Sequence, residues 1–519
     1  MRNPPLVKVL LSLLSAVLIS TTFIIQQSWF LALFYLVPLL ISLKDSTTGS
    51  AFRLGTLTGA AAYFITSYWL IDTISVFGGF PLVISIFFHI VISIYSGLIF
   101  GIFSYLIVKL HFQDKSMLFT IFTGILWVAI EYYFPLLFPF SIASPLGNYY
   151  PLIQASDLVG INFYSFLLIF FNFTFFHIIT ASRFGKNLYR GEIPVAVLLT
   201  VIILLYGFNR IGVIDKQIGN AMKLKVGIVQ GNFDFTEKKM DNYLVMVNEY
   251  KKLSRLLDSE AQLIIWPETA VQVFIPTDGK FLELDGKLLI PDNTKSYYLT
   301  GGLSYEIINK KKPINAENVN QYNSAFLTDS KGKILGRFHK IKLLLFGEHL
   351  PFSGYFPSIK KLSPATGDYI PGKELNLLKV ERYGLKIATL ICYEDIIPSF
   401  ARRFKQKGAN ILVNLTNDAW FGKTIAPYQH LLIALPRSVE NRSYFIRATN
   451  TGVSAIIDPV GRILIKTDIF KQEKIEGTVG LMNNNITFYA LHGYRIYQIC
   501  LVISVIYLFI KLVLRRNDR

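Results

Sequence analysis

Apolar runs separated by short polar loops fill the first 210 residues of the chain and return over its last 25. Each run approaches the ~20 residues that a helix needs to cross the roughly 30 Å hydrocarbon core of a bilayer. The pattern predicts eight transmembrane helices, seven before a more polar region and one after it. The predicted spans cover 6–25, 28–43, 54–76, 81–108, 117–138, 158–181, 192–210 and 496–514.

At Met222 the pattern changes to short apolar runs separated by helical and loop segments. Strands interleaved with helices predict a layered α/β or α+β domain. We expect a helical membrane domain over 1–211, the α/β domain over 212–491, and a last transmembrane helix with its tail over 492–519. The expected strands are Leu224–Gln230, Leu263–Trp266, Tyr298–Leu303, Ser324–Thr328, Ile334–His339, Leu385–Cys392, Ile411–Leu415, Val453–Ile457 and Arg462–Ile465, and helices are expected over 236–257, 396–407 and 429–444.

Basic residues are spread unevenly over the loops between the apolar runs. Alternate loops carry them, whereas the short loops near 26–28, 77–81 and 139–157 contain no Lys or Arg. Cytoplasmic loops of membrane proteins are enriched in basic residues, so both termini are predicted to be cytoplasmic and the α/β domain to lie outside the cytoplasm. The first run resembles a signal peptide, but no small-residue cleavage site follows it, and we interpret it as an uncleaved span. The basic residues are Arg2, Lys8, Lys44, Arg53, Lys109, Lys115, Arg183, Lys186, Arg190, Lys511, Arg515, Arg516 and Arg519.

The net charge of +18 does not point to nucleic acid. About half of the excess lies in loops and tails beside apolar runs, where basic residues fix membrane orientation. No helix-turn-helix, zinc finger or platform of aromatic and basic residues is visible in the sequence. Two cysteines exclude a disulfide framework. Because Cys500 lies in the last apolar run, Cys392 is the only thiol of the polar region.

Two carboxylates, Asp72 and Glu131, fall within or near predicted spans. An ionisable group inside a membrane is a functional candidate by default. Both positions lie towards the outer ends of their helices, where hydration accounts for a charge, and we favour this structural explanation over a functional one.

Reactive side chains lie at the ends of three apolar strands that the sequence predicts in the polar region. Glu268 follows the first of these strands, Lys340 and then Glu348 follow the second, and Cys392 ends the third. A thiol needs a base or a lowered pKa to attack a carbonyl at neutral pH. A carboxylate can accept its proton, and an ammonium group can stabilise the developing oxyanion. Each signal is weak alone, since a lone cysteine more often fills a core and a lysine on an edge strand is usually solvated.

Together, in the order Glu, Lys, Cys, these groups resemble the catalytic set of the nitrilase (carbon–nitrogen hydrolase) superfamily. The motifs VGIVQGN, WPE, FGEHLP, ICYED and NLTNDAWFG occur in the superfamily's order over about 222–480. The eight predicted spans narrow the resemblance to its membrane-embedded branch, the apolipoprotein N-acyltransferase family of bacterial inner membranes. The resemblance implies an αββα sandwich for the polar domain. Further matching motifs are QGN at Gln230–Asn232, YN at Tyr322–Asn323, CYE at Cys392–Glu394 and RATNTGVSA at Arg447–Ala455.

The resemblance also implies roles for the residues at the three strand ends. Cys392 is expected to be the nucleophile, Glu268 the general base and Lys340 the lysine of a catalytic triad. Lys342 lies two residues away on the same strand face, but the family's spacing of eight residues before the glutamate of FGE selects Lys340. Glu348 is that second glutamate, expected to orient Lys340 or to assist proton transfer.

Five further residues match positions that the family places around the pocket. The Tyr393 backbone N–H is a plausible oxyanion donor. For all five, an architectural role and direct participation stay equally open. These residues are Tyr393, Glu394, Asn417, Asp418 and Trp420.

The resemblance implies a two-step acyl transfer in a bacterial inner membrane. A membrane phospholipid is the expected acyl donor, and the N-terminal amine of a diacylglyceryl lipoprotein is the expected acceptor. We expect neither a cofactor nor a metal, and no nucleic-acid partner. The residues alone supply only a membrane-facing thiol site for acyl transfer. The apolar segments Leu343–Phe356 and Trp420–Leu435 either form a flap that admits acyl chains or pack on the spans.

Two other functions stay open. A membrane-anchored amidase or nitrilase of the same fold would release ammonia from a small amide and would need no phospholipid. A multispan transporter with a vestigial triad would keep its transport activity after the substitution Cys392→Ala, which should abolish acyl transfer.

Overall fold

The computed structural model describes residues 4–110, 116–181, 191–233, 243–257, 260–315, 318–344, 347–348, 368–483 and 486–517. The chain divides into two compact units. A helical unit comprises Met1–Ile71, Pro81–Gly212 and Thr487–Arg519, and a sheet unit comprises Asp72–Phe80 and Val213–Ile486. A short insert from the helical half of the sequence, Asp72–Phe80, therefore folds with the sheets.

Every predicted span falls on an apolar helical segment. Within the described ranges, six segments are long and apolar enough to cross a membrane. A pair of helices would reach that length only if the two were counted as one bent span, and one apolar helix, of 17 residues, is shorter than a span requires. The number of membrane crossings therefore stays a prediction. The six segments are α1 (Pro5–Ile24), Gln26–Leu43, α5 (Leu82–Lys109), Ile161–Thr180, α9 (Glu192–Asn220) and Phe488–Lys511 of α14 (Phe488–Asn517). Of these, Gln26–Leu43 ends in α2 (Val37–Leu43), and Ile161–Thr180 includes most of α8 (Tyr164–Ala181). The bent pair is α3 (Thr48–Thr66) with Leu70–Phe77, which begins with α4 (Leu70–Asp72), and the short helix is α6 (Met117–Tyr133).

Helices α3 and α5 pack through small residues. A Cβ atom added at Gly97 of α5 would lie 2.5 Å from the backbone nitrogen of Ala60, and one added at Gly59 of α3 would lie 2.8 Å from the Gly97 Cα. Small residues at such contacts let two membrane helices approach closely. Beyond the end of α3 the chain bends by 71° before Leu70–Phe77. In the last turn of α3 before this bend, the backbone carbonyl of Phe64 is hydrogen-bonded to Nε2 of His89 on α5, at 3.1 Å.

Glu131 near the end of α6 is buried, so the hydration that we expected from the sequence is wrong, and protein hydrogen bonds account for the carboxylate instead. The side chain is 6% exposed. Its carboxylate accepts hydrogen bonds from the Ile142 backbone N–H at 2.8 Å, the Ser165 hydroxyl at 2.7 Å, the Ser141 hydroxyl at 3.1 Å and the Trp127 indole at 3.3 Å. A buried carboxylate with this many donors is fully satisfied and ties the chain after α6 to α8.

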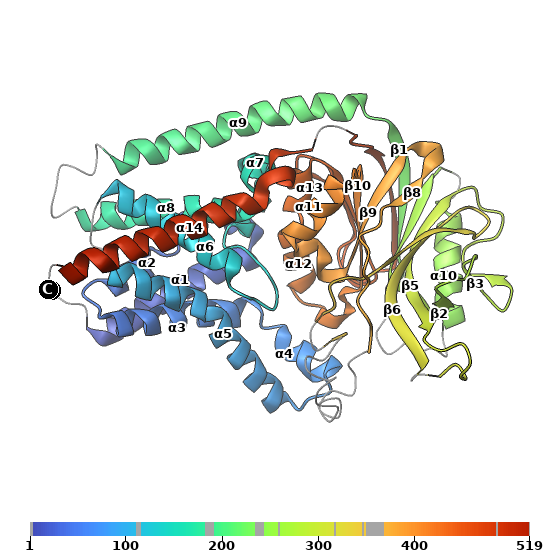
Figure 1. Ribbon diagram of the computed structural model, residues 1–519, viewed down its shortest axis with the longest axis horizontal. Coiled ribbons are helices and arrows are strands. Elements are labelled where there is room, and N and C mark those ends of the chain that lie inside the picture. Colours follow the sequence, from blue (N-terminus) through green and yellow to red (C-terminus); the bar gives the residue numbers. More distant parts are fainter. Residues whose placement is uncertain are drawn as a thin grey trace. The chain divides into compact units, whose positions relative to one another are not determined.

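The described part of the sheet unit contains two six-stranded sheets and a small hairpin (Figure 1). The strand order is β14-β1-β2-β5-β6-β7 in the first sheet and β13-β12-β11-β10-β9-β8 in the second. The pairs β1–β2–β5 and β9–β10–β11 are parallel, and the outer pairs are antiparallel. The bounds are β1 Lys223–Gln230, β2 Leu263–Pro276, β3 Glu283–Leu284, β4 Lys287–Leu288, β5 Tyr297–Ile307, β6 Val319–Thr328, β7 Ile334–His339, β8 Leu378–Val380, β9 Leu385–Ile391, β10 Ile411–Thr416, β11 Tyr444–Thr449, β12 Ala455–Ile457, β13 Ile463–Lys466 and β14 Glu473–Gly480.

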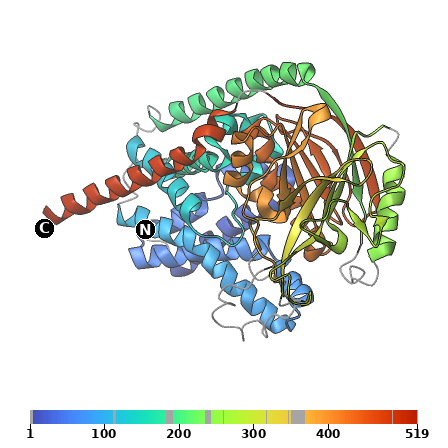
Figure 2. The same ribbon diagram turned by 45° about the vertical axis from the view of Figure 1, so that its right-hand side comes forward.

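The two sheets pack face to face between helices. Strands β1 and β2 contact β10 and β11 across the interior, while α10 (Tyr243–Arg255) covers the outer face of β1 and β2. Helices α11 (Pro398–Gln406), α12 (Ala426–Ala434) and α13 (Pro436–Asn441) lie on the side of the second sheet, and Figure 2 shows these layers from a second angle. This is an αββα sandwich, which confirms the predicted fold class.

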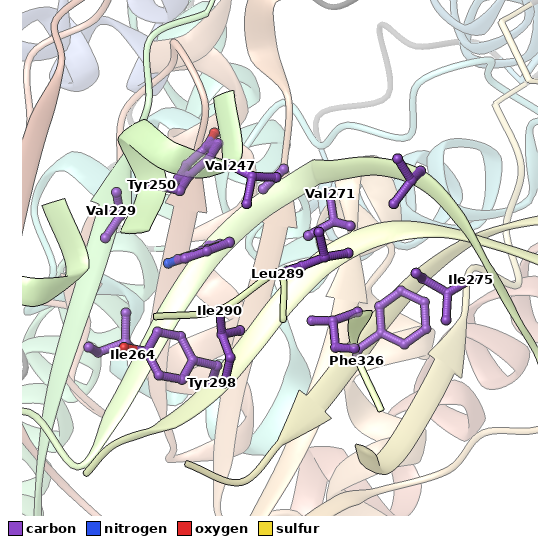
Figure 3. Close-up of a cluster of buried hydrophobic side chains, with 14 of the residues drawn as sticks. Val229, Val247, Tyr250, Ile264, Val271, Ile275, Leu289, Ile290, Tyr298 and Phe326 are labelled. Atoms are coloured by element: carbon purple, nitrogen blue, oxygen red, sulfur yellow. The ribbon is translucent and has the colours of Figure 1, made fainter. Parts of the chain in front are cut away.

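A cluster of buried side chains joins α10 to the first sheet (Figure 3). Tyr250 of α10 stacks on Trp266 of β2 with ring centroids 5.1 Å apart, and Tyr298 of β5 meets Trp266 edge-on. The Trp266 indole N–H donates to the Ser254 hydroxyl at 2.8 Å. These contacts fix β2, the strand that contains Glu268, between α10 and β5.

Three sequence expectations within this unit are wrong in detail. The helix expected over 429–444 is two helices, because Pro436 begins α13 and cannot continue the hydrogen bonds of α12. Tyr444 begins β11, which the sequence analysis did not separate from that helix. The sequence analysis also gave no strand at β8 or β14. Of the helix expected over 236–257, residues 243–255 are helical, and 236–242 lie outside the described residues.

Candidate active site

Cys392 stands at the end of strand β9, which lies between β10 and the edge strand β8. The strand ends at Ile391, and Cys392 begins a 3-10 turn that runs to Ile396. Its φ angle is +53°, in the left-handed region that side chains other than glycine adopt at a cost of about 1–2 kcal/mol. Such strain, held by the surrounding structure, often marks a functional residue. The Cys392 side chain keeps partial exposure, whereas Cys500 is buried in α14.

Glu268 lies inside a strand rather than after one, contrary to the sequence prediction. Strand β2 continues to Pro276, and its register against β5 shifts between Trp266 and Val271. Thr269 has a φ of +49° at this irregularity. Bulges of this kind re-aim a side chain. Here the carboxylate of Glu268 is left 5% exposed in the interior of the unit.

Lys340 is the first residue after β7 and is 1% exposed. Its Nζ lies 2.8 Å from Glu348 Oε2 and 3.4 Å from Glu268 Oε1. Lys342, the alternative lysine, has an exposed side chain. The structure therefore brings Lys340, and not Lys342, to the two glutamates.

Asn323 of β6 joins the two carboxylates, a role that the sequence analysis missed. Its side-chain amide donates to Glu268 Oε1 at 2.7 Å and to Glu348 Oε1 at 2.8 Å. Its backbone carbonyl accepts from the Lys340 N–H at 2.8 Å. The backbone N–H of Asn417 donates to the other oxygen of Glu268 at 2.9 Å. Glu268 thus meets donors from three directions.

The charges of this cluster set its resting state. Burial raises the pKa of the Cys392 thiol, and the negative charge of Glu268 raises it too. The positive charge of Lys340 lowers this pKa, but by less, so the pKa lies well above its usual range. Burial lowers the pKa of Lys340, but the negative charges around it, that of Cys392 once its thiol is ionised and those of Glu348 and Glu268, outweigh burial and hold the pKa well above its usual range. The resting site therefore combines a protonated thiol with a charged ammonium group. The thiol needs a base at the moment of attack.

Comparisons with known proteins identify the family of the chain. Residues 15–174 match the family model described as the apolipoprotein N-acyltransferase N-terminal domain, and residues 225–481 match that of the carbon–nitrogen hydrolases. The apolipoprotein N-acyltransferase of Geobacter metallireducens is 31% identical over 93% of this chain and 91% of its own length. The chain belongs to the apolipoprotein N-acyltransferase family.

A second relative matches nearly the whole chain. The apolipoprotein N-acyltransferase of Rickettsia bellii is 29% identical over 98% of this chain and 97% of its own length. A solved Saccharomyces cerevisiae member of the nitrilase superfamily covers 52% of this chain and 94% of its own, with a TM-score of 0.37 and 19% identity. The resemblance stated from the sequence motifs is confirmed at the level of the family.

Two further positions that match apolipoprotein N-acyltransferase motifs, Tyr393 and Glu394, lie in the turn Cys392–Ile396 and hold it in place. Glu394 is fully buried, and its carboxylate accepts the backbone N–H groups of Ile341, Lys342 and Ile391 at 2.8, 2.9 and 2.8 Å. The Tyr393 hydroxyl donates to the Leu343 carbonyl at 2.8 Å. Both side chains join the turn after β9 to the segment after β7, and the Tyr393 ring centroid also lies 5.8 Å from Lys340 Nζ.

The loop after β10 contains the other three. Asn417 contributes its backbone N–H to Glu268, and its side-chain oxygen accepts from Asn450 at 3.0 Å. Asp418 contacts a histidine, His430, that the sequence analysis did not single out. The Trp420 ring lies 5.0 Å from that of Phe77, in the insert 72–80.

Only one of the two apolar segments is largely described by the structure. Of the apolar segments, Trp420–Leu435 contains a 3-10 turn and α12, whereas most of Leu343–Phe356 lies outside the described residues. Among the residues that the structure describes, no three His, Cys, Asp or Glu side chains are placed to hold a metal ion.

Proposed function

We propose that this protein transfers a fatty acyl chain from a membrane phospholipid, through a thioester on Cys392, to the N-terminal amine of a diacylglyceryl lipoprotein. Membership of the family makes the protein an acyltransferase. The observation that supports the mechanism is the buried cluster of Glu268, Lys340 and Glu348 beside the strained turn of Cys392. The catalytic roles of these residues are part of the proposal.

In the first half-reaction, the Cys392 sulfur attacks the carbonyl carbon of the phospholipid ester. Glu268 accepts the thiol proton as the S–C bond forms. The Lys340 ammonium and the Tyr393 backbone N–H stabilise the oxyanion. The C–O bond to the glycerol oxygen then breaks, Glu268 returns the proton to that oxygen, and the lysophospholipid leaves.

In the second half-reaction, the amine of the acceptor attacks the thioester carbon. Glu268 accepts a proton from the amine, the C–S bond breaks, and the proton returns to the sulfur. An amide is released and the thiol is regenerated. Hydrocarbon around the thioester would limit access of water, which favours transfer over hydrolysis.

We place the sheet unit outside the cytoplasm of a bacterial inner membrane, with both termini cytoplasmic. The support is the alternation of basic and uncharged loops in the sequence. This orientation would set the thiol beside the outer leaflet, where both the phospholipid and a membrane-anchored lipoprotein are available.

The chemistry is tested by incubating membranes that contain the protein with a phospholipid labelled in its acyl chain. We expect a labelled adduct on Cys392 that hydroxylamine removes, and that chases onto an added diacylglyceryl-cysteine peptide. Cys392→Ala should abolish the adduct. Cys500→Ser is the matched control and should keep it, because Cys500 is the buried cysteine of α14. Release of ammonia from a small amide without phospholipid would instead identify a hydrolase.

The orientation is tested with two single-cysteine reporters in a background lacking both native cysteines. Lys310→Cys, on an exposed loop of the sheet unit, should react with a membrane-impermeant maleimide in intact spheroplasts. Lys44→Cys, in an exposed loop after α2, should react only after permeabilisation. The opposite pattern would overturn the proposed orientation without affecting the proposed chemistry.

A further inference from the structure

Four charged side chains form a buried cluster beside the proposed site. His430 of α12 lies with its Nε2 2.9 Å from Asp395 Oδ1 and its Nδ1 3.0 Å from Asp418 Oδ1. Arg447 of β11 pairs with the other oxygen of Asp395, and its second terminal nitrogen lies 3.7 Å from Asp418 Oδ2. The side chains of these residues are between 0% and 7% exposed.

The geometry requires a charged imidazole. A neutral imidazole carries one N–H and would set a lone pair against one of the two carboxylates, whereas an imidazolium donates to both. With His430 protonated, two cations balance two anions, which a buried cluster needs. Burial lowers the pKa of His430, but Asp395 and Asp418 outweigh both burial and the opposing charge of Arg447 and raise the pKa to about 9. Asp395, Arg447 and Asp418 are the charged groups that act most strongly on His430.

Each of the two aspartates belongs to a segment that carries a group of the site. Asp395 lies in the turn that begins with Cys392. Asp418 directly follows Asn417, whose backbone N–H donates to Glu268. The two cations come from α12 and β11, outside both segments.

We propose that His430 and Arg447 are positioning residues that clamp the nucleophile turn to the loop that holds Glu268. The assignment of Cys392 and Glu268 as reacting groups rests on the function proposed above. When His430 loses its proton, the cluster keeps one uncompensated negative charge, and the Asp418 loop moves away from Asp395. The Asn417 N–H then leaves Glu268, and the base no longer stands in register with the thiol. The clamp makes acyl transfer fail reversibly at alkaline pH.

The test uses the full chain in lipid nanodiscs, with a fluorescent phosphatidylethanolamine as donor and a diacylglyceryl-cysteine peptide as acceptor. His430→Gln should lower kcat at least tenfold while KM changes less than twofold, because His430 touches neither substrate. The rate at which iodoacetamide alkylates Cys392 at pH 7.5 should fall in parallel. Alkylation needs no lipid, so it tests the clamp even if the protein proves not to use phospholipid.

The pH profile separates a clamp from a merely structural contact. The kcat of the unmodified protein should fall above pH ~9, where His430 loses its proton. The double variant H430Q/D418N removes one cation and one anion, so it should fold with a balanced cluster and lack this alkaline loss. An alkaline loss at the same pH in the double variant overturns the proposal, and so does an unchanged kcat in folded His430→Gln.

Arg462→Gln is the matched control. Arg462 also lies between two aspartates of the same unit, pairing with Asp215 and with Asp458 at 2.5 Å, but neither segment carries a group of the site. This variant should lose stability and keep the kcat and pH profile of the unmodified protein. A loss of kcat equal to that of His430→Gln would show that any disrupted ion pair has this effect, and would overturn the clamp.

Discussion

The amide of Asn323 holds two carboxylates that would otherwise repel each other across the site. One –NH₂ group donates to Glu268 at 2.7 Å and to Glu348 at 2.8 Å, with the Lys340 ammonium close to both. Because both acceptors are carboxylates, the amide nitrogen must face them. A single neutral side chain thereby fixes the distance between the proposed base and the second glutamate.

Asn323→Ala should therefore lower the rate of acyl transfer by roughly 10- to 100-fold, since small misplacement of reacting groups costs rates of this order. Asn323→Asp should lower it further, because a third carboxylate adds repulsion. Single-turnover acylation of Cys392 by a labelled phospholipid measures both. Asn318→Ala is the control, because Asn318 is similarly buried and its side-chain amide donates to backbone carbonyls of its own loop. Equal losses in both variants would refute a positioning role for Asn323.

The candidate site contains residues that could be identified from local sequence patterns and others whose place depends on contacts between distant parts of the chain. Glu268, Lys340 and Cys392 stand out because each is a polar residue beside an apolar run. Asn323 was noted only as part of the YN motif and His430 not at all, and their contacts could not be predicted because their partners lie 55 and 35 residues away. The bulge that aims Glu268 was also invisible, since it depends on the register between β2 and β5. Pairings across a sheet cannot be deduced from one strand.

At the scale of elements, glycines at the contact between α3 and α5 allow these two helices to lie close together. Gly97→Val should force the helices apart, because its Cβ would meet the backbone of Ala60 and Thr56 at 2.5–2.6 Å. Overpacking of this kind costs about 1–3 kcal/mol. We expect a lower melting temperature in detergent. Gly49→Ala in α3 is the control and should be neutral or mildly stabilising, because no atom lies within 4 Å of its new Cβ. Equal melting temperatures for Gly97→Val and the unmodified protein would contradict this packing.

Elements were predictable where their pattern was strong. Strand β7 was expected over Ile334–His339 and has these bounds, because the polar run 329–333 precedes it and Lys340 follows it. Strand β14 was missed because EKIEGTVG carries three charges and two glycines, which disfavour a strand by propensity. Its pairing with β1 over eight residues outweighs that propensity. Tertiary pairing also decides β11, a fully buried strand beside β10.

For the whole molecule, the buried charge cluster links stability to pH. The pKa of His430 rises from 6.5 in the unfolded chain to about 9 in the folded one. A raised pKa means that its contribution to stability is fully present below pH 6.5 and is lost as the pH rises through 9. The rise corresponds to about 3 kcal/mol. We expect the melting temperature of the purified protein to fall between pH 7 and 10.

His430→Gln should flatten this part of the stability curve, with a lower melting temperature at pH 7 and little difference from the unmodified protein at pH 10. Differential scanning fluorimetry in one detergent across this pH range measures both. A curve of unchanged slope in the variant would show that other groups dominate the alkaline loss.

The protonated resting state of Cys392 bears on how the protein could be inhibited. Reagents that simply seek out thiolates should discriminate poorly in favour of this sulfur. A selective covalent inhibitor should instead offer a carbonyl whose oxygen reaches Lys340 while its carbon sits over the sulfur, so that Glu268 draws the proton away as the bond closes. Compounds built on long-chain esters or carbamates would meet that requirement and would concentrate in the bilayer beforehand.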